Sequence, residues 1–443
     1  MRERVYDIVY SVLEDGKKSD ERFHDEIEGI DSERIAAIKR LSYGTIEYAV
    51  MLGAIIEQYT QKPIQKLDAD VRTCLLMAFY EILFADSIPG YATANEIVEL
   101  AAKKCVKNKE KKKSYINANI RTFLRDIENG VDVFGKLNQN ERLSMPIDLW
   151  NMLNSAYGKK TAAKVAGAFL EKKGEVTLHV DSSRISVSDY IKKLESHTTG
   201  LSIERGRYFD DAVIIRGATD IKSLPGYDTG EFYIQDESSM LPVTVSGIRP
   251  GDSVVDVCGA PGGKSVHALM RLAGTGFVSV RDVSDDKLAR IKENLSRYPY
   301  ENYECKVFDG RKVDEKWSEK ADVVLLDVPC SGVGILRRKP ELKYRCMENA
   351  KELIPIQREI AAASVKLLKP GGVMIYSTCT INPDENDKNV DYLIESFGLI
   401  PESLDEYLPA GLTNSQTKTG RLLVLPGLME MDGFFVARLR KPE

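Results

Sequence analysis

The fold is decided by the stretch Asp256-Val257-Cys258-Gly259-Ala260-Pro261-Gly262-Gly263-Lys264-Ser265. A β-branched run, Ser253 to Val255, leads into it, and helix-forming residues follow it. Two adjacent glycines after a proline let the backbone turn tightly and approach a ligand, and a helix that begins near Lys264 presents unpaired N–H groups there. A turn of this kind is also compatible with a purely structural role. With its neighbours, the stretch predicts a strand, a loop and a helix that cradle a nucleotide-like cofactor.

Four apolar runs downstream of this stretch each end on polar residues. Short apolar runs of this length are typical of buried strands in a parallel sheet. Ligands bind outside the carboxyl ends of such strands, so we expect the residues that follow the runs to converge on one crevice. These residues are Asp282, Asp309, Asp327 and Ser377-Thr378-Cys379.

Length and composition indicate an ordinary globular protein with more than one domain. The chain has 443 residues and a formal net charge of −5, so any nucleic-acid surface must be a local patch. Its seven cysteines are scattered without a C-x-x-C pair, which predicts neither a metal site nor redox chemistry and favours a reduced cytoplasmic protein. The longest apolar stretch, residues 74–85, contains Glu81 and is too short to span a membrane, so we expect a buried helix.

The periodicity of the apolar residues divides the chain into three predicted domains. Residues 1–140 show helical spacing throughout and predict an all-α bundle. Residues 141–235 predict a linker helix followed by a small α+β subdomain with strands near 175–180 and 212–216. Residues 236–443 carry the cofactor stretch and predict an α/β catalytic domain.

A lysine-rich segment lies in the predicted helical domain. Seven lysines and one glutamate fall between Lys103 and Lys113. A solvated loop explains such a run. A phosphate-contacting loop explains it equally well, because lysines bind nucleic acid by neutralising backbone charge. The residues alone leave both interpretations open.

Two cysteines follow neighbouring predicted strands. Cys330 lies in Asp327-Val328-Pro329-Cys330-Ser331-Gly332-Val333-Gly334, and Cys379 lies in Ser377-Thr378-Cys379-Thr380. A single cysteine at such a place is usually a small buried hydrophobe. Two of them in the crevice of a cofactor loop favour a chemical role.

In these motifs the chain resembles the Sun/Fmu, or RsmB-like, family of S-adenosylmethionine-dependent RNA methyltransferases that act on carbon 5 of cytosine. The resemblance covers essentially the whole chain and is carried by residues 256–265, 327–334 with 337–340, and 376–386. The N-terminal region resembles, more loosely, the NusB-type RNA-binding domain, mainly through residues 117–125. The resemblance implies a NusB-like bundle, an RRM-like middle subdomain and a Rossmann-like domain with a mostly parallel seven-stranded sheet.

The resemblance also implies roles for the candidate catalytic residues. Cys379 would attack carbon 6 of the cytosine, which makes carbon 5 nucleophilic. Cys330 would assist elimination and product release, although related DNA enzymes attack with the equivalent of this Pro-Cys thiol. Asp327 would bind the exocyclic amine or share a proton with ring nitrogen 3.

The implied cofactor is S-adenosyl-L-methionine. The loop would wrap its methionine part, Asp282 would bind the ribose hydroxyls, Asp309 would meet the adenine edge, and Asp327 would border the same site. The loop residues concerned are Cys258, Gly259, Ala260, Pro261, Gly262, Gly263 and Lys264.

Several features depart from the family pattern or add to it. Gly259 stands where alanine is usual, and Arg281 stands where an apolar strand residue is expected. Glu385 and Asn386 are expected to orient the loop of Cys379, although a helix cap explains Asn386 nearly as well. A basic segment beside the Cys330 loop predicts phosphate positioning: Arg337, Arg338, Lys339, Lys343 and Arg345.

The implied substrate is an unpaired cytosine in small-subunit (16S) ribosomal RNA, free or in an assembly intermediate, because a stacked base is out of reach of a cysteine. We expect a cytoplasmic monomer without membrane contact. Methylation of another RNA such as tRNA, or a non-catalytic NusB-type RNA-binding factor, are the alternatives. A small-molecule or protein methyltransferase would not need paired cysteines, and a nicotinamide dehydrogenase would prefer G-x-G-x-x-G.

Overall fold

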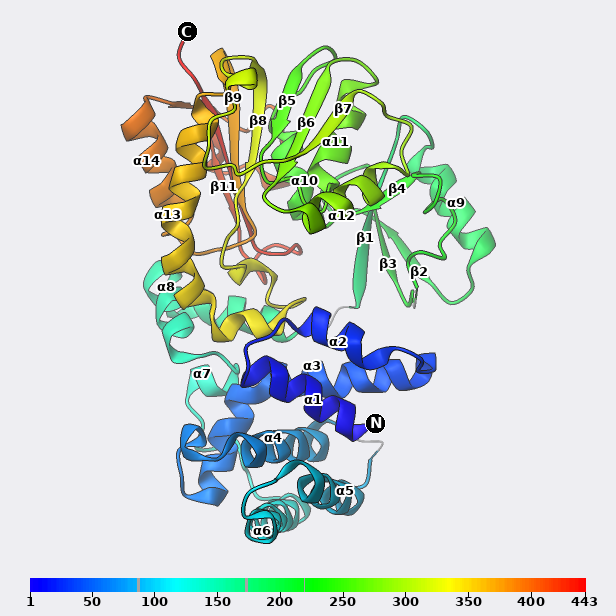
Figure 1. The fold of residues 1–443 in the computed structure, drawn as a ribbon, viewed down its shortest axis with the longest axis vertical. Helices are drawn as coiled ribbons and strands as arrows, with labels where there is room; N and C mark the ends of the chain where they lie inside the picture. Colours follow the sequence, from blue (N-terminus) through cyan, green and yellow to red (C-terminus); the bar gives the residue numbers. More distant parts are fainter. Residues whose placement is uncertain (86–87, 172–173, 219) are drawn as a thin grey trace. The chain divides into compact units, whose positions relative to one another are not determined.

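The computed structural model describes residues 1–443 apart from 86–87, 172–173 and 219. The chain forms two compact units (Figure 1). The first comprises residues 1–170 and 336–347, and the second comprises residues 171–335 and 348–443. A short segment of the C-terminal half of the sequence is therefore part of the N-terminal unit.

The first unit is a helical bundle, as the apolar periodicity predicts. Its apolar positions meet in one core that includes Ile8, Ile38, Phe79 and Phe123. Its helices are α1 (Arg2–Leu13), α2 (Ser19–Ile27), α3 (Ser32–Thr60), α4 (Ala69–Phe84), α5 (Gly90–Lys104), α6 (Lys109–Glu128), α7 (Gln139–Arg142) and α8 (Ile147–Leu170).

Helix α4 is the centre of this bundle and confirms the predicted buried helix. Its one buried acid, Glu81, is only 1% exposed and needs compensation. Arg2 donates from Nη2 to Glu81 Oε2 at 2.7 Å, and Thr93 donates from Oγ1 to the same oxygen at 3.0 Å. No helix in the described part of the chain is long and apolar enough to cross a membrane.

The segment 336–347 contributes to the first unit through the turn η4 (Pro340–Tyr344). Lys343 is 3% exposed and donates to the carbonyl oxygens of Glu47 and, at 2.8 Å, Ser144. The hydroxyl of Tyr344 donates to the carbonyl oxygen of Ile46. Burial lowers the pKa of Lys343 to about 7, although Glu47 opposes the shift. The prediction that Lys343 positions phosphates is therefore wrong, because its amine is enclosed by backbone carbonyls.

The second unit begins with a four-stranded antiparallel sheet in the order β2-β3-β1-β4. Tyr190 and Leu194 of the helix α9 pack with Leu178 and Val213 from the sheet. Strand β2 was not predicted, because its residues are mostly exposed and lack an apolar alternation. The elements are β1 (Glu175–Val180), α9 (Val187–His197), β2 (Ser202–Arg205), β3 (Ala212–Arg216) and β4 (Phe232–Ile234).

The larger sheet of this unit carries the polar strand ends. Strands β7-β6-β5-β8-β9 are parallel, and β12 pairs antiparallel with β9. Val254 and Val255, adjacent on β5, belong to apolar clusters on opposite faces, so helices cover both sides. The strands are β5 (Ser253–Asp256), β6 (Phe277–Asp282), β7 (Tyr303–Val307), β8 (Ala321–Asp327), β9 (Leu368–Thr378), β10 (Ile400–Pro401), β11 (Arg421–Val424) and β12 (Phe434–Arg440).

The mostly parallel sheet is confirmed, but within the described residues it has eight strands, not the predicted seven. Strand β10 has two residues, one of them a proline, which is too short for a readable alternation. The order reverses at β5, between β6 and β8, which is where an open parallel sheet binds its ligands. The helices around this sheet are α10 (Glu237–Thr244), α11 (Gly263–Leu272), α12 (Asp285–Leu295), α13 (Cys346–Val365) and α14 (Asp387–Phe397).

Candidate active site

The glycine-rich loop joins β5 to α11 and is held against the end of β6. The N–H of Gly259 donates to the carbonyl oxygen of Arg281 at 2.8 Å, and the N–H of Ala260 donates to Asp282 Oδ2 at 3.1 Å. A Cβ atom at Gly259 would lie 2.6 Å from Cγ1 of Val280, so glycine at this position lets the loop lie close against β6. Gly262 caps α11 with φ 113°, a backbone conformation that side chains other than glycine rarely adopt.

Asp256 lies under this loop at the end of β5. It is fully buried, and its Oδ2 accepts from the hydroxyl of Ser265 at 2.6 Å. Its Oδ1 has no hydrogen-bond partner among the described residues. Burial raises the pKa of Asp256 to about 6, and the hydrogen bond from Ser265 only partly opposes the shift.

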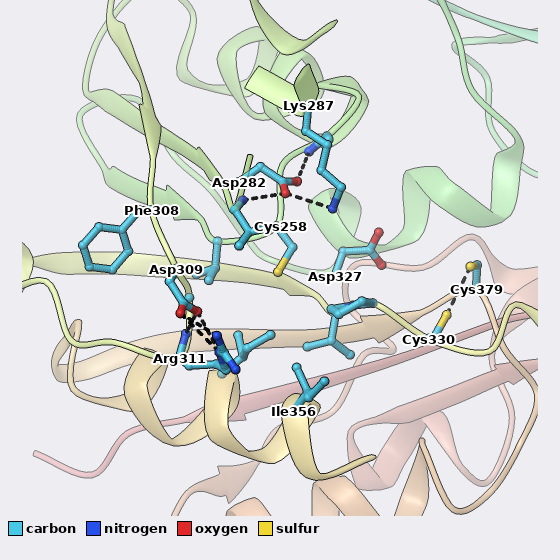
Figure 2. A pocket seen from close by; sticks show the side chains of 17 residues that line it. Cys258, Asp282, Lys287, Phe308, Asp309, Arg311, Asp327, Cys330, Ile356 and Cys379 are labelled. Atoms are coloured by element: carbon cyan, nitrogen blue, oxygen red, sulfur yellow. Dashed lines mark hydrogen bonds and ion pairs between the residues drawn. The ribbon is translucent and has the colours of Figure 1, made fainter. Parts of the chain in front are cut away.

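Asp282 is fixed at the end of β6 by its own surroundings. It is 4% exposed, and its Oδ1 accepts from the N–H of Val283 at 2.7 Å and from Lys287 Nζ at 3.0 Å. Lys287, on α12, was not singled out from the sequence, because a lysine in the first turns of a surface helix has no distinguishing pattern. Figure 2 shows Asp282 between Lys287 and the loop.

A cavity of about 420 Å³ opens beside this carboxylate (Figure 2). It brings together the predicted Cys258, Ala260, Asp282, Asp309 and Asp327 with both cysteines of the Pro-Cys and Thr-Cys motifs. Its apolar wall was missed, because an apolar helix stripe cannot be told from ordinary core by sequence. The unpredicted lining residues include Val283, Phe308, Ile356 and Ile360.

Asp309 lies two residues beyond the end of β7 and forms a two-pronged contact with Arg311. Arg311 donates from Nη2 to Asp309 Oδ2 at 2.8 Å and from Nε to Oδ1 at 2.9 Å. The hydrogen bonds from Arg311 lower the pKa of Asp309 to about 2. Both residues line the cavity.

Asp327 connects the cofactor loop to the end of β9. Lys264 donates from Nζ to Asp327 Oδ2 at 2.7 Å, and Ser377 donates from Oγ to Oδ1 at 2.7 Å. Burial favours the neutral amine of Lys264, but the charge of Asp327 keeps the pKa of Lys264 raised. The pairing of Asp327 with Ser377 follows from the register of β8 and β9.

The structure brings the two predicted thiols into contact. Cys330 Sγ lies 3.2 Å from Cys379 Sγ at one end of the cavity (Figure 2). The hydrogen bond to Cys379, together with burial, raises the pKa of Cys330 well above its ordinary value. The raised pKa favours the thiol form of Cys330, and either sulfur can be the donor in the contact.

The buried charge of Arg281 on β6 is compensated by partners that lie behind the cavity wall. Its side chain is 1% exposed, and its Nη2 lies 3.2 Å from Asp314 Oδ2. Its guanidinium lies 5.3 Å from the ring centroid of Phe308 and 5.7 Å from that of Trp317. A charged residue on β6 is thus compatible with a buried strand.

Comparison with known proteins finds one family model that matches the C-terminal part of the chain and one that matches the N-terminal part. Residues 243–440 match the model of the family described as 16S rRNA methyltransferase RsmB/F, and residues 1–125 match that of the NusB family. A relative from Bacillus subtilis (strain 168), described as a probable ribosomal RNA small subunit methyltransferase B, is 31% identical over 413 residues. The match covers 91% of this chain and 90% of that protein.

Solved structures share the fold. The crystal structure of PH0851 covers 100% of this chain and 99% of its own, with a TM-score of 0.77 and 22% identity. NSun6 from Pyrococcus horikoshii covers 67% of this chain and 98% of its own, with a TM-score of 0.60 and 22% identity. The cofactor loop, the cavity and the relatives together show that this chain belongs to the RsmB/F family of S-adenosylmethionine-dependent 16S rRNA methyltransferases.

Proposed function

We propose that this protein methylates carbon 5 of a cytosine in small-subunit (16S) ribosomal RNA through a transient bond between Cys379 and carbon 6. The observation that carries the proposal is the contact of the two thiols, 3.2 Å apart, in a cavity that is also lined by Asp327 and by Cys258 and Ala260 of the cofactor loop. The small-subunit RNA named for the Bacillus subtilis relative supports the choice of substrate. We therefore place the enzyme in the cytoplasm.

The cavity fits S-adenosylmethionine, which supplies an electrophilic methyl group. Asp282, held by the N–H of Ala260, offers carboxylate oxygens to ribose hydroxyls. Phe308, Ile356 and Ile360 offer an apolar wall to the adenine, and Asp309 lies at its edge. The loop from Cys258 to Lys264, of which Cys258 and Ala260 line the cavity, would hold the methionine part, and the N-terminus of α11 would favour its carboxylate.

The first step is the addition of the Cys379 thiolate to carbon 6 of the cytosine. A new S–C bond forms, and the electron pair of the 5,6 double bond makes carbon 5 behave like an enamine. Asp327 would accept a hydrogen bond from the exocyclic amine, or share a proton with ring nitrogen 3, and so stabilise the charge that builds on attack. Lys264 and Ser377 hold Asp327 in place for this contact.

Carbon 5 would then attack the methyl group that S-adenosylmethionine supplies, with S-adenosylhomocysteine as the leaving group. The proton of carbon 5 must pass to a general base, and the electron pair of that bond restores the 5,6 double bond. The bond from carbon 6 to Cys379 breaks, and its electron pair returns to sulfur. Cys330, which keeps its proton, donates a hydrogen bond to the departing thiolate.

Single-cysteine variants test this assignment. Cys330→Ala should accumulate a covalent protein–RNA adduct that survives denaturing gels, while Cys379→Ala should lose both the adduct and methylation. Methylation of carbon 5 by Cys379→Ala would contradict the mechanism. An adduct through Cys330 in that variant would assign the attack to the Pro-Cys thiol instead.

Bisulfite sequencing of RNA from a deletion strain tests the substrate. A single cytosine in small-subunit ribosomal RNA should become convertible by bisulfite in the deletion strain. It should resist conversion again when the gene is restored. Loss of protection in tRNA instead would favour the alternative RNA substrate. No change in any RNA, with ribosomal RNA still bound by the protein, would favour a non-catalytic binding factor.

A further inference from the structure

Glu385 is a fully buried carboxylate whose two oxygens each accept two hydrogen bonds. Its Oε1 accepts from the N–H of Ser331 at 2.8 Å and from Gln357 Nε2 at 3.0 Å. Its Oε2 accepts from the hydroxyl of Ser331 and from Asn382 Nδ2 at 3.1 Å. Glu385, Ser331 and Gln357 are each at most 1% exposed. A carboxylate in such a place is stabilised by these donors alone.

Two of these donors fix the residues on both sides of Cys330. Ser331 follows Cys330, and Gln357 also donates from Nε2 to the carbonyl oxygen of Pro329, which precedes it, at 2.9 Å. Gln357 is itself fixed by Asn389, which donates from Nδ2 to its Oε1 at 2.7 Å. Gln357 thus holds Pro329, the residue before Cys330, and Glu385 holds Ser331, the residue after it.

Cys379 depends on a different set of contacts. It directly follows β9, where Thr378 pairs with Phe435 of β12 and Ser377 pairs with Asp327 of β8. Thr378 also donates from Oγ1 to Asn386 Oδ1 at 2.6 Å. The carboxylate of Glu385 contacts this loop directly at Asn382, three residues beyond Cys379, and reaches Thr380 through the 2.9 Å contact of the Ser331 and Thr380 hydroxyls.

We infer that Glu385 is a positioning residue that, together with Gln357, sets Cys330 against Cys379 for the breakdown of the covalent intermediate. The inference rests on the proposed function. It extends the expectation that Glu385 orients the Cys379 loop, because the carboxylate contacts the Cys330 turn through Ser331 as well as the Cys379 loop through Asn382. Loss of Glu385 should therefore slow release of Cys379 from carbon 6 more than its attack.

Glu385→Gln is the sharpest variant, because it keeps the shape and changes one oxygen to a donor. In one orientation the new NH₂ group meets two donors, the N–H of Ser331 and Gln357 Nε2; in the other it meets Asn382 Nδ2 and the Ser331 hydroxyl, which can turn to accept. The turn must shift to relieve this conflict. A displacement of about 1 Å in a reacting group costs roughly 100-fold in rate.

The experiment compares two rates in the full-length protein with a ribosomal RNA fragment that contains the target cytosine. Adduct formation is followed on denaturing gels in a single turnover, and release is followed as free methylated RNA. Glu385→Gln should release product roughly 100-fold more slowly and accumulate adduct, with adduct formation slowed less than about 10-fold. Ser331→Ala, which removes one of the four donors, should give a smaller effect in the same direction.

Asp384→Asn is the matched control, since Asp384 is the neighbouring residue, is 52% exposed and forms its ion pair with Lys388, on the solvent side of the loop. It should match the wild type in both rates. Binding of S-adenosylhomocysteine by each variant checks that the cofactor site is folded.

The outcomes separate this inference from the proposed function. If Cys330→Ala traps an adduct while Glu385→Gln releases product like the wild type, or loses attack and release equally with cofactor binding intact, the inference is overturned. If Cys330→Ala traps no adduct, the proposed mechanism itself fails. Adduct accumulation in both variants supports the inference.

Discussion

Nζ of Lys264 lies 2.7 Å from Oδ2 of Asp327, so one ion pair joins the glycine-rich loop to the carboxylate beside the two thiols. Lys264 is 15% exposed and Asp327 is 25% exposed. Through this contact, the position of Asp327, which is proposed to bind the cytosine, is coupled to the position of the cofactor loop.

Replacing Lys264 should therefore affect Asp327 as well as the loop. Lys264→Met leaves a partly buried carboxylate without its cation, whereas the double variant with Asp327→Asn removes both charges. A double-mutant cycle by urea unfolding should give a coupling energy of about 0.5–3 kcal/mol. Additive effects of the two substitutions would mean that the ion pair does not connect the two segments energetically.

Asp282→Asn should weaken cofactor binding. The carboxylate would lose its charge toward the ribose hydroxyls and its pairing with Lys287. Loss of a charged hydrogen bond costs about 1.5–3 kcal/mol, which is roughly a 10- to 100-fold rise in the Kd of S-adenosylhomocysteine by calorimetry. Asp285→Asn, in the exposed first turn of α12, should leave the Kd unchanged. Equal affinities of both variants would remove Asp282 from the site.

The lysine-rich segment separates into structural and exposed members. Lys112 is 14% exposed and lies 2.8 Å from Asp68 and 2.7 Å from Asp70, so Lys112→Ala should destabilise the helical unit. Lys107, Lys109 and Lys111 are exposed. Their joint replacement by alanine should weaken RNA binding and lower the salt slope by roughly 0.7–0.9 for each phosphate that is no longer neutralised.

Helix α6 begins at Lys109, and a lysine in the first turn opposes the helix dipole. The triple variant should therefore unfold at the same urea concentration as the wild type or a higher one, which separates weaker RNA binding from damage to the fold. The structure limits the predicted loop to residues 105–108, since α5 ends at Lys104 and α6 begins at Lys109, so an unchanged salt slope would mean that these lysines are only solvated.

Lys343→Met should change how the stability of the helical unit depends on pH. The folded unit holds Lys343 with a pKa of about 7, whereas the unfolded chain has the ordinary value of about 10.4. Between these values the unfolded state binds more protons, so stability rises with pH by up to roughly 1.4 kcal/mol per unit. The variant should lack this rise and should leave two buried carbonyl oxygens without their donor.

The fluorescence of Trp150, in α8, reports the unfolding of this unit when Trp317 is replaced by phenylalanine. Urea midpoints at pH 7 and pH 9 measure the difference. Lys339→Met in the same segment is the control, because Lys339 is 44% exposed. Parallel pH profiles of Lys343→Met and the wild type would contradict the lowered pKa.

The sequence predicted the features that depend on short-range pattern. The turn at Gly262, the strand ends at Asp282 and Asp327, and the helical bundle are encoded in stretches of about ten residues. Features that depend on contacts between distant residues were missed. Nothing in the neighbourhood of Gln357 indicates that it donates to Pro329, and nothing around Lys343 indicates a cage of carbonyls from residues 47 and 144.

The membership of residues 336–347 in the N-terminal unit has a consequence for biosynthesis. Domains generally fold as they emerge from the ribosome, beginning at the N-terminus. The complete unit has to wait, because the peptide that supplies Lys343 and Tyr344 is translated only after four of the eight described strands of the methyltransferase sheet, β5 to β8. Transplanting the first 170 residues onto another enzyme would leave out that peptide, so the module cannot be exchanged as a single continuous cassette.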